Sequence, residues 1–396
     1  MLYLLLAYSG GVFPAIPSHS DEELDTLITD IIRLSAGLGS GIHPKVAGAI
    51  SEFITHINSY FTNAMEGNPS KLKDIEDALN NNLSPNKVLR NYQLEHLAHI
   101  STQKKMLERL AKEENLEICS KDFLCWLHRE FYSTLPEEMH FARTHKNTKV
   151  PVLPGQLRDR PADVGNHLPP DTLDEIENNL TIFQEAYSLK GLSGIKKFLA
   201  FASSHHRLLW IHPFRDGNGR VARLFTLAFE NRLGIDSRGL WTVTRALARN
   251  RSEYDKHLML ADQPRRNDYD GRGPLSEENL ILFCKYFLRE CLDQLDFMGG
   301  MLELSNFEGR YKRHLKILEA EKTISRAAVS VLEEMLYKGN LSRGSVQDIC
   351  GVKRRRATEI IKELLNSRLA TSRSVHGDLQ FNLTRDLAAA LFPKLV

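Results

Sequence analysis

The segment HPFRDGNGRVAR, at residues 212–223, gathers side chains and backbone groups that bind phosphate. Its Gly-Asn-Gly turn lets the backbone bend sharply and exposes N–H groups at the start of a predicted helix, where the helix dipole also favours an anion. Arg220 and Arg223 lie three residues apart, so their guanidinium groups project from one face of that helix. Because guanidinium groups bind phosphate through paired hydrogen bonds, the pattern predicts a polyphosphate site.

Three further residues of the segment indicate what happens to that polyphosphate. Asp216 stands just before the glycine turn, and a carboxylate together with phosphate oxygens is a ligand set that Mg²⁺ prefers. His212 can accept a proton from an incoming hydroxyl, as a general base does, and Phe214 is expected to anchor the loop. The segment therefore predicts nucleotidyl or phosphoryl transfer to an alcohol. The alternative, a structural histidine beside a solvent-exposed turn, does not explain why all these groups occur together.

The composition is that of an ordinary globular protein. Of the 396 residues, 42% are hydrophobic and 26% are charged, which predicts two or three domains. The formal charge is +2, so a nucleic acid would need a local basic surface. The five cysteines lack paired spacing, which favours reduced core thiols in a cytosol. The apolar start, MLYLLLAYSGGVF, is too short to span a bilayer and predicts a packed segment, with a signal peptide as the alternative.

Helical periodicity dominates the chain and predicts a mainly α fold. Apolar stripes indicate an N-terminal helical bundle, and residues 86–115 predict one long charged helix. Residues 221–233 are apolar nearly all round, so that helix is expected to run through the middle of a domain. The exception is 148–171, where prolines and glycines exclude a helix interior and allow a short surface hairpin. Residues 298–324 predict a charged connector.

The last part of the chain, from residue 325, changes character. Three predicted helices are followed by two short strands around a His-Gly-Asp turn, which indicates a winged helix-turn-helix. Between residues 343 and 373, eight basic residues outnumber three acidic ones, as suits contact with a DNA backbone. The alternative is a docking or dimerisation module whose charges only solvate a face. The outward residues of the third helix, and so the candidates for DNA contact, are Arg354, Arg355, Thr358 and Lys362.

Residues 212–223 resemble the signature of the Fic family, H-x-F-x-D/E-G-N-G-R-x-x-R, at every specified position. The resemblance implies a protein adenylyltransferase, which transfers AMP from ATP to a Ser, Thr or Tyr hydroxyl of a target protein in the presence of Mg²⁺. In that reaction His212 would be the base and Asp216 the metal ligand. The implied phosphate cradle consists of Gly217, Asn218, Gly219, Arg220 and Arg223.

Two stretches N-terminal to the signature extend the resemblance. PGQLRDRPADVGNHLPP, at 154–170, resembles the family's flap hairpin, which aligns the target segment, although any proline-rich surface hairpin is the alternative. TNAMEG, at 62–67, resembles the family's inhibitory pattern, in which Ser or Thr precedes Glu by four residues and Gly or Asn follows. The resemblance implies that Glu66 pairs with Arg223, which then no longer holds the γ-phosphate of ATP in its productive pose. The alternative is an ordinary helix end.

One stretch departs from the family pattern. ARNRSEYDKHL resembles the family's NRxxYY stretch, whose two aromatic residues help to line the pocket for the nucleotide base, but the second position is Asp255 here. Tyr254 is a candidate for that pocket, with an interior tyrosine as the alternative. The preference for ATP over another nucleotide is therefore implied by the family alone.

The resulting hypothesis is an autoinhibited adenylyltransferase with a Fic-type helical core, a small β-hairpin flap, an N-terminal helical bundle and a C-terminal winged helix. The expected domains are 1–117 with the inhibitory segment, 118–297 as the Fic core, 298–324 as the connector and 325–396 as the winged helix. The expected partners are a target protein and DNA, in a cytoplasmic homodimer without membrane contact. Two alternatives remain. In one, the same site removes AMP, with Glu66 positioning water; in the other, the chain is a transcriptional regulator whose Fic core senses nucleotide.

Overall fold

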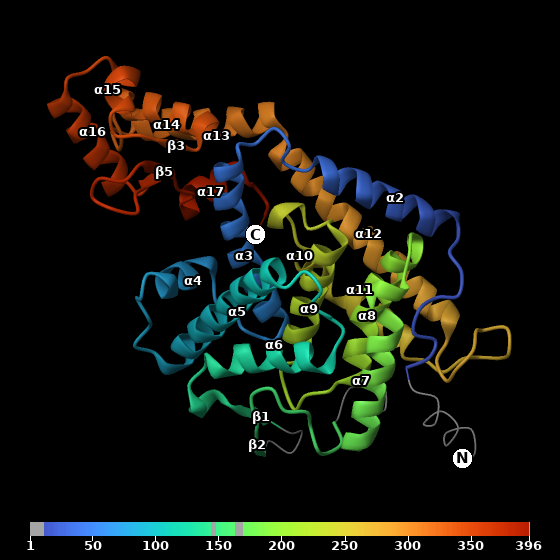
Figure 1. Cartoon of the computed structure of the whole chain (residues 1–396). Helices are drawn as coiled ribbons and strands as arrows, with labels where there is room; N and C mark the ends of the chain where they lie inside the picture. The colour runs from blue at the N-terminus through green and yellow to red at the C-terminus, as the bar shows by residue number, and fades with distance from the viewer. Residues whose placement is uncertain (1–11, 144–147, 163–168, 396) are drawn as a thin grey trace. The chain divides into compact units, whose positions relative to one another are not determined.

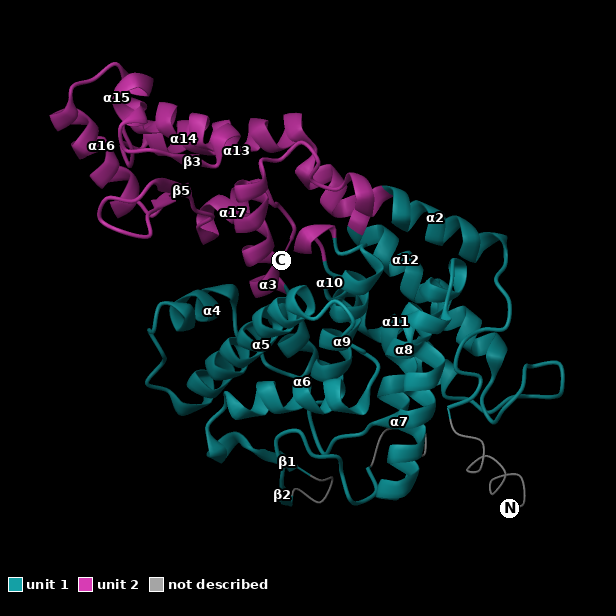
Figure 2. Cartoon of the chain, in the orientation of Figure 1, with its two compact units in different colours: residues 1–33, 58–236, 242–294 teal, residues 34–57, 237–241, 295–396 magenta. Residues whose placement is uncertain are grey.

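The computed structural model describes residues 12–143, 148–162 and 169–395, and the chain folds into two compact units. The first unit comprises residues 1–33, 58–236 and 242–294, and the second comprises 34–57, 237–241 and 295–396 (Figure 2). Three helices begin in one unit and end in the other: α2 (Glu22–Gly37), α3 (Pro44–Met65) and α12 (Glu277–Leu302). All the residues of the segment at 212–223, where the sequence predicts a phosphate site, belong to the first unit.

The described part of the first unit is built mainly of helices (Figure 1). Helix α8 (Ile195–Ile211) packs against α7 (Leu173–Tyr187) and α9 (Asn218–Leu233). Helix α9 also contacts α5 (Lys87–Lys112) and α6 (Lys121–Ser133). The remaining elements are α4 (Leu72–Leu79), which packs on α5, α10 (Thr244–Arg249), which packs on α11 (Arg251–Ala261), and the 3₁₀ turns η1 (Glu137–Met139) and η2 (Leu189–Gly191).

Helix α9 lies at the centre of this packing, as its apolar sequence predicts. Every residue from 220 to 230 is buried, and the helix ends at Gly234, whose φ of 71° is in the left-handed region that glycine adopts easily. Since α5, α6 and α8 all contact α9, the amino end of α9 has a fixed position in the unit. The Gly-Asn-Gly turn is attached to that end.

Side-chain caps set the starts of several predicted helices. Asn86 begins α5 by accepting hydrogen bonds from the N–H groups of Val88 and Leu89, and Ser120 begins α6 by accepting one from Phe123. Thr172 begins α7 with a capping box, in which its side chain and that of a glutamate three residues later each accept a backbone N–H. The long charged helix predicted at 86–115 is therefore present, with bounds close to the expected ones.

The hairpin lies nearer the N-terminus than the sequence predicts. Strand β1 (Phe141–Arg143) pairs antiparallel with β2 (Lys149–Pro151), with Ala142 opposite Val150. The described residues of the predicted flap at 154–170 form no strand, and residues 163–168 lie outside the described part of the chain. The predicted placement was wrong because the strand pairing precedes the proline-rich stretch. It passes through Pro151 to a hydrogen bond from the Val152 N–H to the carbonyl oxygen of His140, at 2.9 Å, and four further prolines follow by residue 170.

The second unit contains a small three-stranded sheet. Its strands are antiparallel in the order β3–β5–β4, with Asn340 opposite Gln380 and Ala370 opposite Phe381. The order from α14 onwards, which is helix, strand, two helices and two strands, favours the predicted winged helix-turn-helix, which stays a prediction. The elements are α13 (Leu304–Ala320), α14 (Arg326–Lys338), β3 (Asn340–Leu341), α15 (Ser345–Cys350), α16 (Arg354–Asn366), β4 (Ala370–Thr371), β5 (Leu379–Phe381) and α17 (Arg385–Leu391), with the 3₁₀ turn η3 (Ser237–Gly239).

Two predictions concern the helices of this unit: the charged connector at 298–324 and the outward residues of α16. Residues 298–324 were expected to be a connector, but most of them form the end of α12 and the whole of α13, which packs on α14 and α17. The pattern was hard to see because charged residues surround a narrow stripe of buried Phe307, Tyr311 and Leu315. In α16, the predicted outward residues are exposed, and most of the predicted apolar stripe is buried.

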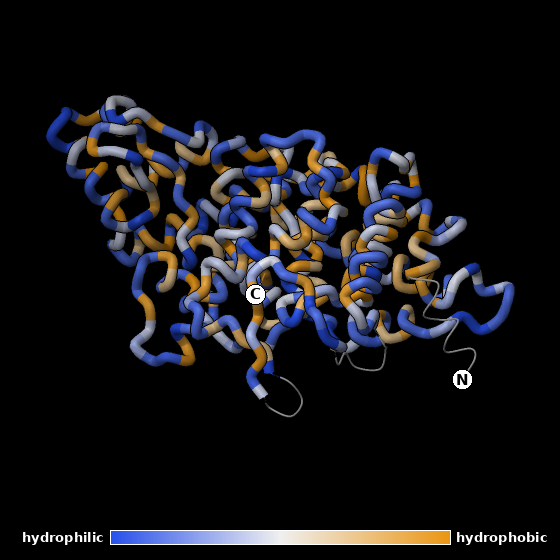
Figure 3. The backbone as a smooth tube through the Cα atoms, turned by 60° about the horizontal axis from the view of Figure 1, so that its bottom comes forward, coloured by the Kyte–Doolittle hydropathy of each residue, from blue (hydrophilic) through white to orange (hydrophobic). Residues whose placement is uncertain are grey.

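Hydrophobic and hydrophilic residues are interspersed along the helices (Figure 3). Within the described residues, no helix has the length and apolar character needed to cross a membrane. All five cysteines carry free thiols, as predicted. Cys119, Cys284 and Cys291 are buried, and burial raises the pKa of each of these thiols. They therefore behave as core residues.

The buried carboxyl group of Glu230, on α9, generates a prediction about stability. Neither of its oxygens has a hydrogen-bond partner among the described residues, and burial, followed by the charge of Asp236, raises its pKa well above 4.5. As the pH rises above 4.5, the unfolded chain loses a proton that the folded chain retains, which costs up to about 1.4 kcal/mol per pH unit. We expect Glu230→Gln to raise the free energy of unfolding, increasingly from about pH 5 to about pH 8, in denaturant titrations.

The matched control is Glu185→Gln, at an exposed position of α7. It should leave the free energy of unfolding almost unchanged across that pH range. A Glu230→Gln gain that is the same at both pH values would contradict the protonated state assigned to Glu230.

Candidate active site

The loop between α8 and α9 holds the predicted catalytic residues in an uncommon backbone conformation. His212 ends α8 with φ 50° and ψ 58°, and Gly217 precedes α9 with φ 78°. Glycine adopts this left-handed region freely, whereas a histidine there is strained. Because such strain persists only where neighbouring groups fix it, the residues that hold the loop are part of the site.

Arg158 holds the first half of the loop. Its buried guanidinium donates from Nε to the carbonyl oxygen of His212 at 2.7 Å and from NH2 to that of Ile211 at 3.3 Å and of Pro170 at 2.5 Å. Burial lowers the pKa of Arg158 to about 10, so the group remains charged near neutral pH. The sequence assigns no role to Arg158, because an arginine within a proline-rich loop normally lies at the surface.

Phe214 and Asn218 lock the second half of the loop onto α9. Phe214 is fully buried, as predicted. The Asn218 side chain donates from Nδ2 to the carbonyl oxygen of Phe214 at 2.8 Å and accepts at Oδ1 from its N–H at 2.9 Å. Both polar atoms of this side chain therefore serve to hold the loop, which fixes the start of α9 and its backbone N–H groups.

Two residues of α6 hold Asp216, the predicted metal ligand. The Tyr132 hydroxyl donates to Oδ2 of Asp216 at 2.6 Å. The Gly155 N–H donates to Nδ1 of His128 at 2.8 Å, so the ring hydrogen is on Nε2, which donates to the Asp216 carbonyl oxygen at 3.2 Å. Burial lowers the pKa of His128 to about 4, which keeps the ring neutral. Neither Tyr132 nor His128 has a sequence pattern that could have indicated this contact.

The residues present fit Mg²⁺ as a metal bound mainly by the nucleotide. Within the described part of the chain, no group of three or more His, Cys, Asp or Glu residues could hold a metal alone. Asp216 uses Oδ2 for Tyr132, and no described residue donates a hydrogen bond to its Oδ1. One carboxylate oxygen beside a phosphate site suits Mg²⁺, which takes its other ligands from phosphates and water.

The structure pairs Arg223 with Glu66, as the resemblance implies. NH2 of Arg223 lies 2.5 Å from Oε1 of Glu66, and Arg223 also donates to the hydroxyl and carbonyl oxygens of Thr62. The Arg223 side chain is 4% exposed and that of Glu66 is 26% exposed. Burial opposes the charge on Glu66, but nearby arginines, Arg223 first, outweigh it and lower the pKa of Glu66. The carboxylate is therefore ionised.

The Glu66 carboxylate lies over the backbone of Gly219, in the first turn of α9. A Cβ atom added to Gly219 would collide with Oε1 of Glu66 and come within 3.0 Å of the Arg223 guanidinium. An anion therefore already occupies the space where helix amides and a guanidinium converge. This is the position in which the sequence predicts a phosphate.

Arg220 is also held by protein groups. Its Nε donates to Oδ1 of Asn63 at 3.1 Å, its NH2 lies 3.4 Å from Oε1 of Glu95, and its guanidinium lies 5.1 Å from the centre of the Phe131 ring. Burial raises the pKa of Glu95, because the charge of Arg220 offsets it only in part. Glu95 was not expected at the site, since it belongs to a helix whose charges otherwise indicate a solvated surface.

Buried hydrogen bonds tie the carboxyl end of α3, and the segment that follows it, to α5. Nδ1 of His96 lies 3.0 Å from the Ser59 hydroxyl, and its Nε2 lies 2.7 Å from the Ser70 hydroxyl. Asn58 donates to Oε1 of Gln103 at 2.8 Å. Burial lowers the pKa of His96 to about 4, so these bonds are made by a neutral ring. The segment that carries Glu66 is thus anchored on both sides of the glutamate.

The region of the predicted base pocket differs from the expectation. Tyr254 is 3% exposed, and its hydroxyl lies 2.7 Å from Nε2 of His205, which favours the interior alternative for this tyrosine. Asp255 accepts from Nε of Arg251 at 2.8 Å, and Arg251 donates to the carbonyl oxygen of Met65 at 2.7 Å. At the position where the family pattern has an aromatic residue, Asp255 therefore orients an arginine towards the end of α3.

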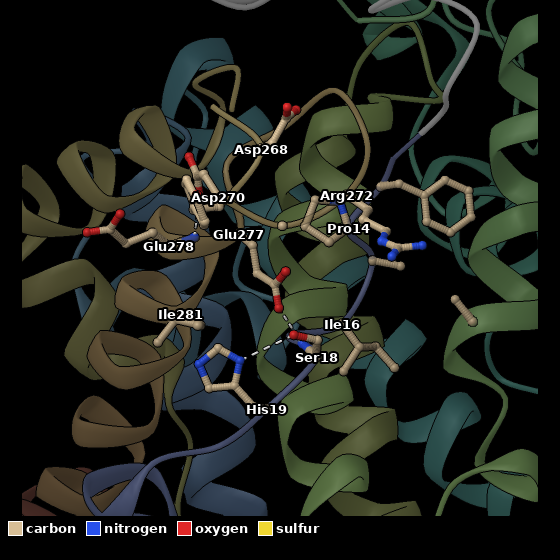
Figure 4. A pocket seen from close by; sticks show the side chains of 15 residues that line it. Pro14, Ile16, Ser18, His19, Asp268, Asp270, Arg272, Glu277, Glu278 and Ile281 are labelled. Carbon is tan, nitrogen blue, oxygen red and sulfur yellow. Dashed lines mark hydrogen bonds between the residues drawn. The ribbon is translucent and has the colours of Figure 1, made fainter. Parts of the chain in front are cut away.

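Figure 4 shows a pocket in the first unit. Its lining comes from within residues 13–19 and 268–281 and from Ala186, and no predicted site residue contributes to it. Its buried acids already have partners: Oε1 of Glu277 accepts the Ser18 N–H at 2.5 Å, and Asp270 accepts the Ser276 hydroxyl at 3.0 Å. These hydrogen bonds hold the leading segment against α12. The two acids are therefore structural and are not candidates for a reacting group.

Comparisons with known proteins agree with the geometry of the segment at 212–223. Residues 118–229 match the family model described as Fic/DOC family. The chain is 25% identical over 231 residues to the protein adenylyltransferase Fic of Nematostella vectensis, which covers 58% of this chain and 49% of that protein. It is 26% identical over 148 residues to the protein adenylyltransferase Fic of Drosophila mojavensis, covering 37% and 28%. The chain thus spans about half or less of the length of these relatives.

Two solved structures share the fold. A Fic family protein from Desulfovibrio desulfuricans aligns with a TM-score of 0.50 at 14% identity, over 93% of this chain and 98% of that one. A Fic domain containing signaling protein from Bacteroides thetaiotaomicron aligns with a TM-score of 0.51 at 19% identity, over 70% and 95%. The chain therefore carries a Fic domain, has the fold of Fic proteins and is homologous to protein adenylyltransferase Fic.

The support that Arg158 gives to the loop can be tested directly. Lysine has one ammonium group in place of the planar fork, so Arg158→Lys leaves buried carbonyl oxygens of the loop without donors. We expect the free energy of unfolding to fall by about 2 kcal/mol in denaturant titrations. Amide hydrogen exchange should also become faster at residues 211–218. The control is Arg160→Lys, at an exposed position; equal values for the two variants would rule out a role for Arg158 in holding the loop.

Proposed function

We propose that this chain is an autoinhibited protein adenylyltransferase, which transfers AMP from ATP to a Ser, Thr or Tyr hydroxyl of a target protein in the presence of Mg²⁺. The observation that carries the proposal is the anion position over Gly219, which Glu66 occupies beside Arg223. That position follows directly on the loop that carries His212 and Asp216. Homology to protein adenylyltransferase Fic supports the same class of reaction.

In the proposed reaction, His212 accepts the proton of the target hydroxyl. The hydroxyl oxygen then forms a bond to the α-phosphorus of ATP, the bond from that phosphorus to the bridging oxygen breaks, and pyrophosphate leaves with the electron pair. Arg220, Arg223 and the amides of the first turn of α9 bind the phosphates and offset their charge. Mg²⁺, held by Asp216 and the nucleotide, would supply further charge compensation.

Autoinhibition follows from the competition between a carboxylate and a phosphate for Arg223. A charge-assisted hydrogen bond is worth about 1.5 to 3 kcal/mol, and about 2.7 kcal/mol corresponds to a hundredfold in rate. The buried hydrogen bonds around His96 already hold the segment that carries Glu66, so little conformational entropy is lost when Glu66 pairs with Arg223. The pair is thus strong enough to suppress turnover while Glu66 remains in place.

The target protein is proposed to dock beside the β1–β2 hairpin. Within the described residues, no third strand pairs with β1 or β2, and Phe141 and Leu153 are exposed beside them, with 44% and 52% of their surface accessible. An extended target segment paired with this hairpin would lie close to the loop, because Arg158, seven residues after Pro151, donates to His212.

The expected effect of releasing Arg223 is strong protein labelling. In cell extract with Mg²⁺ and ATP labelled at the α-phosphate, Glu66→Gly should label proteins, including itself, at least about tenfold more than the native chain. Adding His212→Ala should abolish the label, because the base is lost. The measurement is the radioactivity retained in protein bands after denaturing electrophoresis.

Three outcomes would contradict parts of this proposal. Label that persists without His212 would remove it as the base, and label that appears only from the γ-phosphate would indicate a kinase-like transfer. Loss of label from pre-labelled protein, faster with native Glu66 than with Glu66→Gly, would favour the reverse reaction, in which Glu66 positions water. The same labelled protein can therefore be used to measure both the transfer of AMP and its removal.

A second candidate function, DNA binding, rests on the exposed basic row of α16. Arg354, Arg355, Thr358 and Lys362 are all exposed, and the buried face of the same helix holds it on the small sheet. The Arg355 side chain is 94% exposed, and its Nε lies 3.6 Å from Oε1 of Glu359; because such an exposed ion pair contributes little, a phosphate backbone can compete for this guanidinium. This observation favours a second activity in the same chain, with the Fic core either as transferase or as nucleotide sensor.

We expect the double variant Arg354→Ala, Arg355→Ala to weaken retention on duplex DNA. The slope of log affinity against log salt should fall by about 2, because two phosphate contacts are lost. The control removes the same charge from exposed positions of α14, with Arg326→Ala and Lys338→Ala. Equal retention of the two double variants would exclude this face of α16. DNA retention without transferase activity in any variant, Glu66→Gly included, would favour the sensor.

A further inference from the structure

Tyr132 makes a contact that the proposed reaction does not yet use. Its hydroxyl lies 2.6 Å from Oδ2 of Asp216, and its ring is 2% exposed beneath the turn, where a Cβ on Gly217 would come within 3.0 Å of it. The ring belongs to a buried cluster with Phe131 and Val152. The hydroxyl therefore has one fixed direction, towards the carboxylate.

The phenol hydroxyl donates to Oδ2 of Asp216 at 2.6 Å, within the range of a short, strong hydrogen bond to a carboxylate. One of the two carboxylate oxygens of Asp216 is thus permanently engaged by the protein.

The backbone of Asp216 is fixed by the same helix. His128, one turn before Tyr132 on α6, donates to the Asp216 carbonyl oxygen at 3.2 Å, and its other ring nitrogen is occupied by the Gly155 N–H. Side chain and main chain of Asp216 are therefore held by two residues four apart on one helix face. The carboxylate has little freedom to rotate and present both oxygens to a ligand.

We propose that Tyr132 sets the metal preference of the site: by engaging Oδ2, it favours coordination of Asp216 through Oδ1, and this favours Mg²⁺ over Ca²⁺. The inference rests on the proposed function, since it concerns the metal that accompanies the nucleotide. Mg²⁺ is small, requires near-octahedral geometry and keeps several waters, so a single carboxylate oxygen suits it. Ca²⁺ takes six to eight oxygens and often binds both oxygens of a carboxylate, a mode that the Tyr132 hydrogen bond disfavours because it uses one lone pair of Oδ2 and fixes the carboxylate. Tyr132 is a positioning residue, because it acts on the metal through Asp216.

The test measures binding rather than turnover. Calorimetry would follow the binding of α,β-methylene ATP, which cannot release pyrophosphate, to full-length Glu66→Gly protein in Mg²⁺, in Ca²⁺ and without metal. We expect tighter binding in Mg²⁺ than in Ca²⁺, and we expect Tyr132→Phe to lower the ratio of the two affinities about tenfold. The matched control is Tyr286→Phe, which removes a buried hydroxyl that has no partner among the described residues and should leave the ratio unchanged.

Any other outcome of this experiment would contradict the inference. An unchanged ratio, or an equal loss in both metals, would show that Tyr132 only supports the loop. No nucleotide binding by Glu66→Gly in either metal would instead remove the proposed function, and the inference with it. If thermal unfolding shows that Tyr132→Phe is not folded, 4-fluorophenylalanine at position 132 fills the volume of the hydroxyl without donating, and the same fall in the ratio is expected.

Discussion

The contact between Glu66 and Arg223 is the interaction on which the site depends. It brings a carboxylate from the end of α3 to the amino end of α9, over Gly219. Three favourable contributions act on an anion at this point: backbone N–H groups, the helix dipole and a guanidinium that is 4% exposed. A buried guanidinium with no partner would cost about 3 to 5 kcal/mol. An anion is therefore strongly favoured at this position. In the proposed enzyme, either the Glu66 carboxylate or a phosphate of the nucleotide occupies it.

The loop before α9 is organised in advance of any substrate. His212 adopts a strained backbone conformation that Arg158 fixes through buried hydrogen bonds, and Asn218 fastens the rest of the loop to the helix. Asp216 is oriented by Tyr132. The proposed base, the proposed metal ligand and the anion position thus keep set distances from one another, so little reorganisation would be needed when a nucleotide binds. The stability of the loop comes from residues outside the segment that carries the reacting groups.

The sequence predicted the local features well, because their signals are contiguous. The glycine turn, the buried helix that follows it and the anchor Phe214 all lie within one short segment. The partners of that segment come from distant parts of the chain, and no pattern in the sequence connects Arg158, Glu95 or Tyr132 with it. The hairpin was misplaced because the strand pairing precedes the proline-rich stretch: it passes through Pro151 to the hydrogen bond between Val152 and His140, and the other prolines follow. Helix α13 was missed because its apolar stripe, Phe307, Tyr311 and Leu315, is narrow within a charged surface.

The two guanidinium groups of the cradle are held with unequal strength, which bears on how inhibition would work. Arg223 has a direct, short contact with Glu66, and the charge of Arg223 and the neighbouring arginines outweighs burial and lowers the pKa of Glu66, so this carboxylate keeps its charge. Arg220 lies 3.4 Å from Glu95, whose pKa is raised, so that carboxylate gives up its charge more easily. A phosphate arriving at the amino end of α9 therefore meets a weaker competitor at Arg220 than at Arg223. For the proposed reaction, this difference implies that a nucleotide can engage Arg220 while Glu66 still holds Arg223. Inhibition would then act on the pose of the terminal phosphate, and through it on the line of attack at the α-phosphorus, more than on entry of the nucleotide.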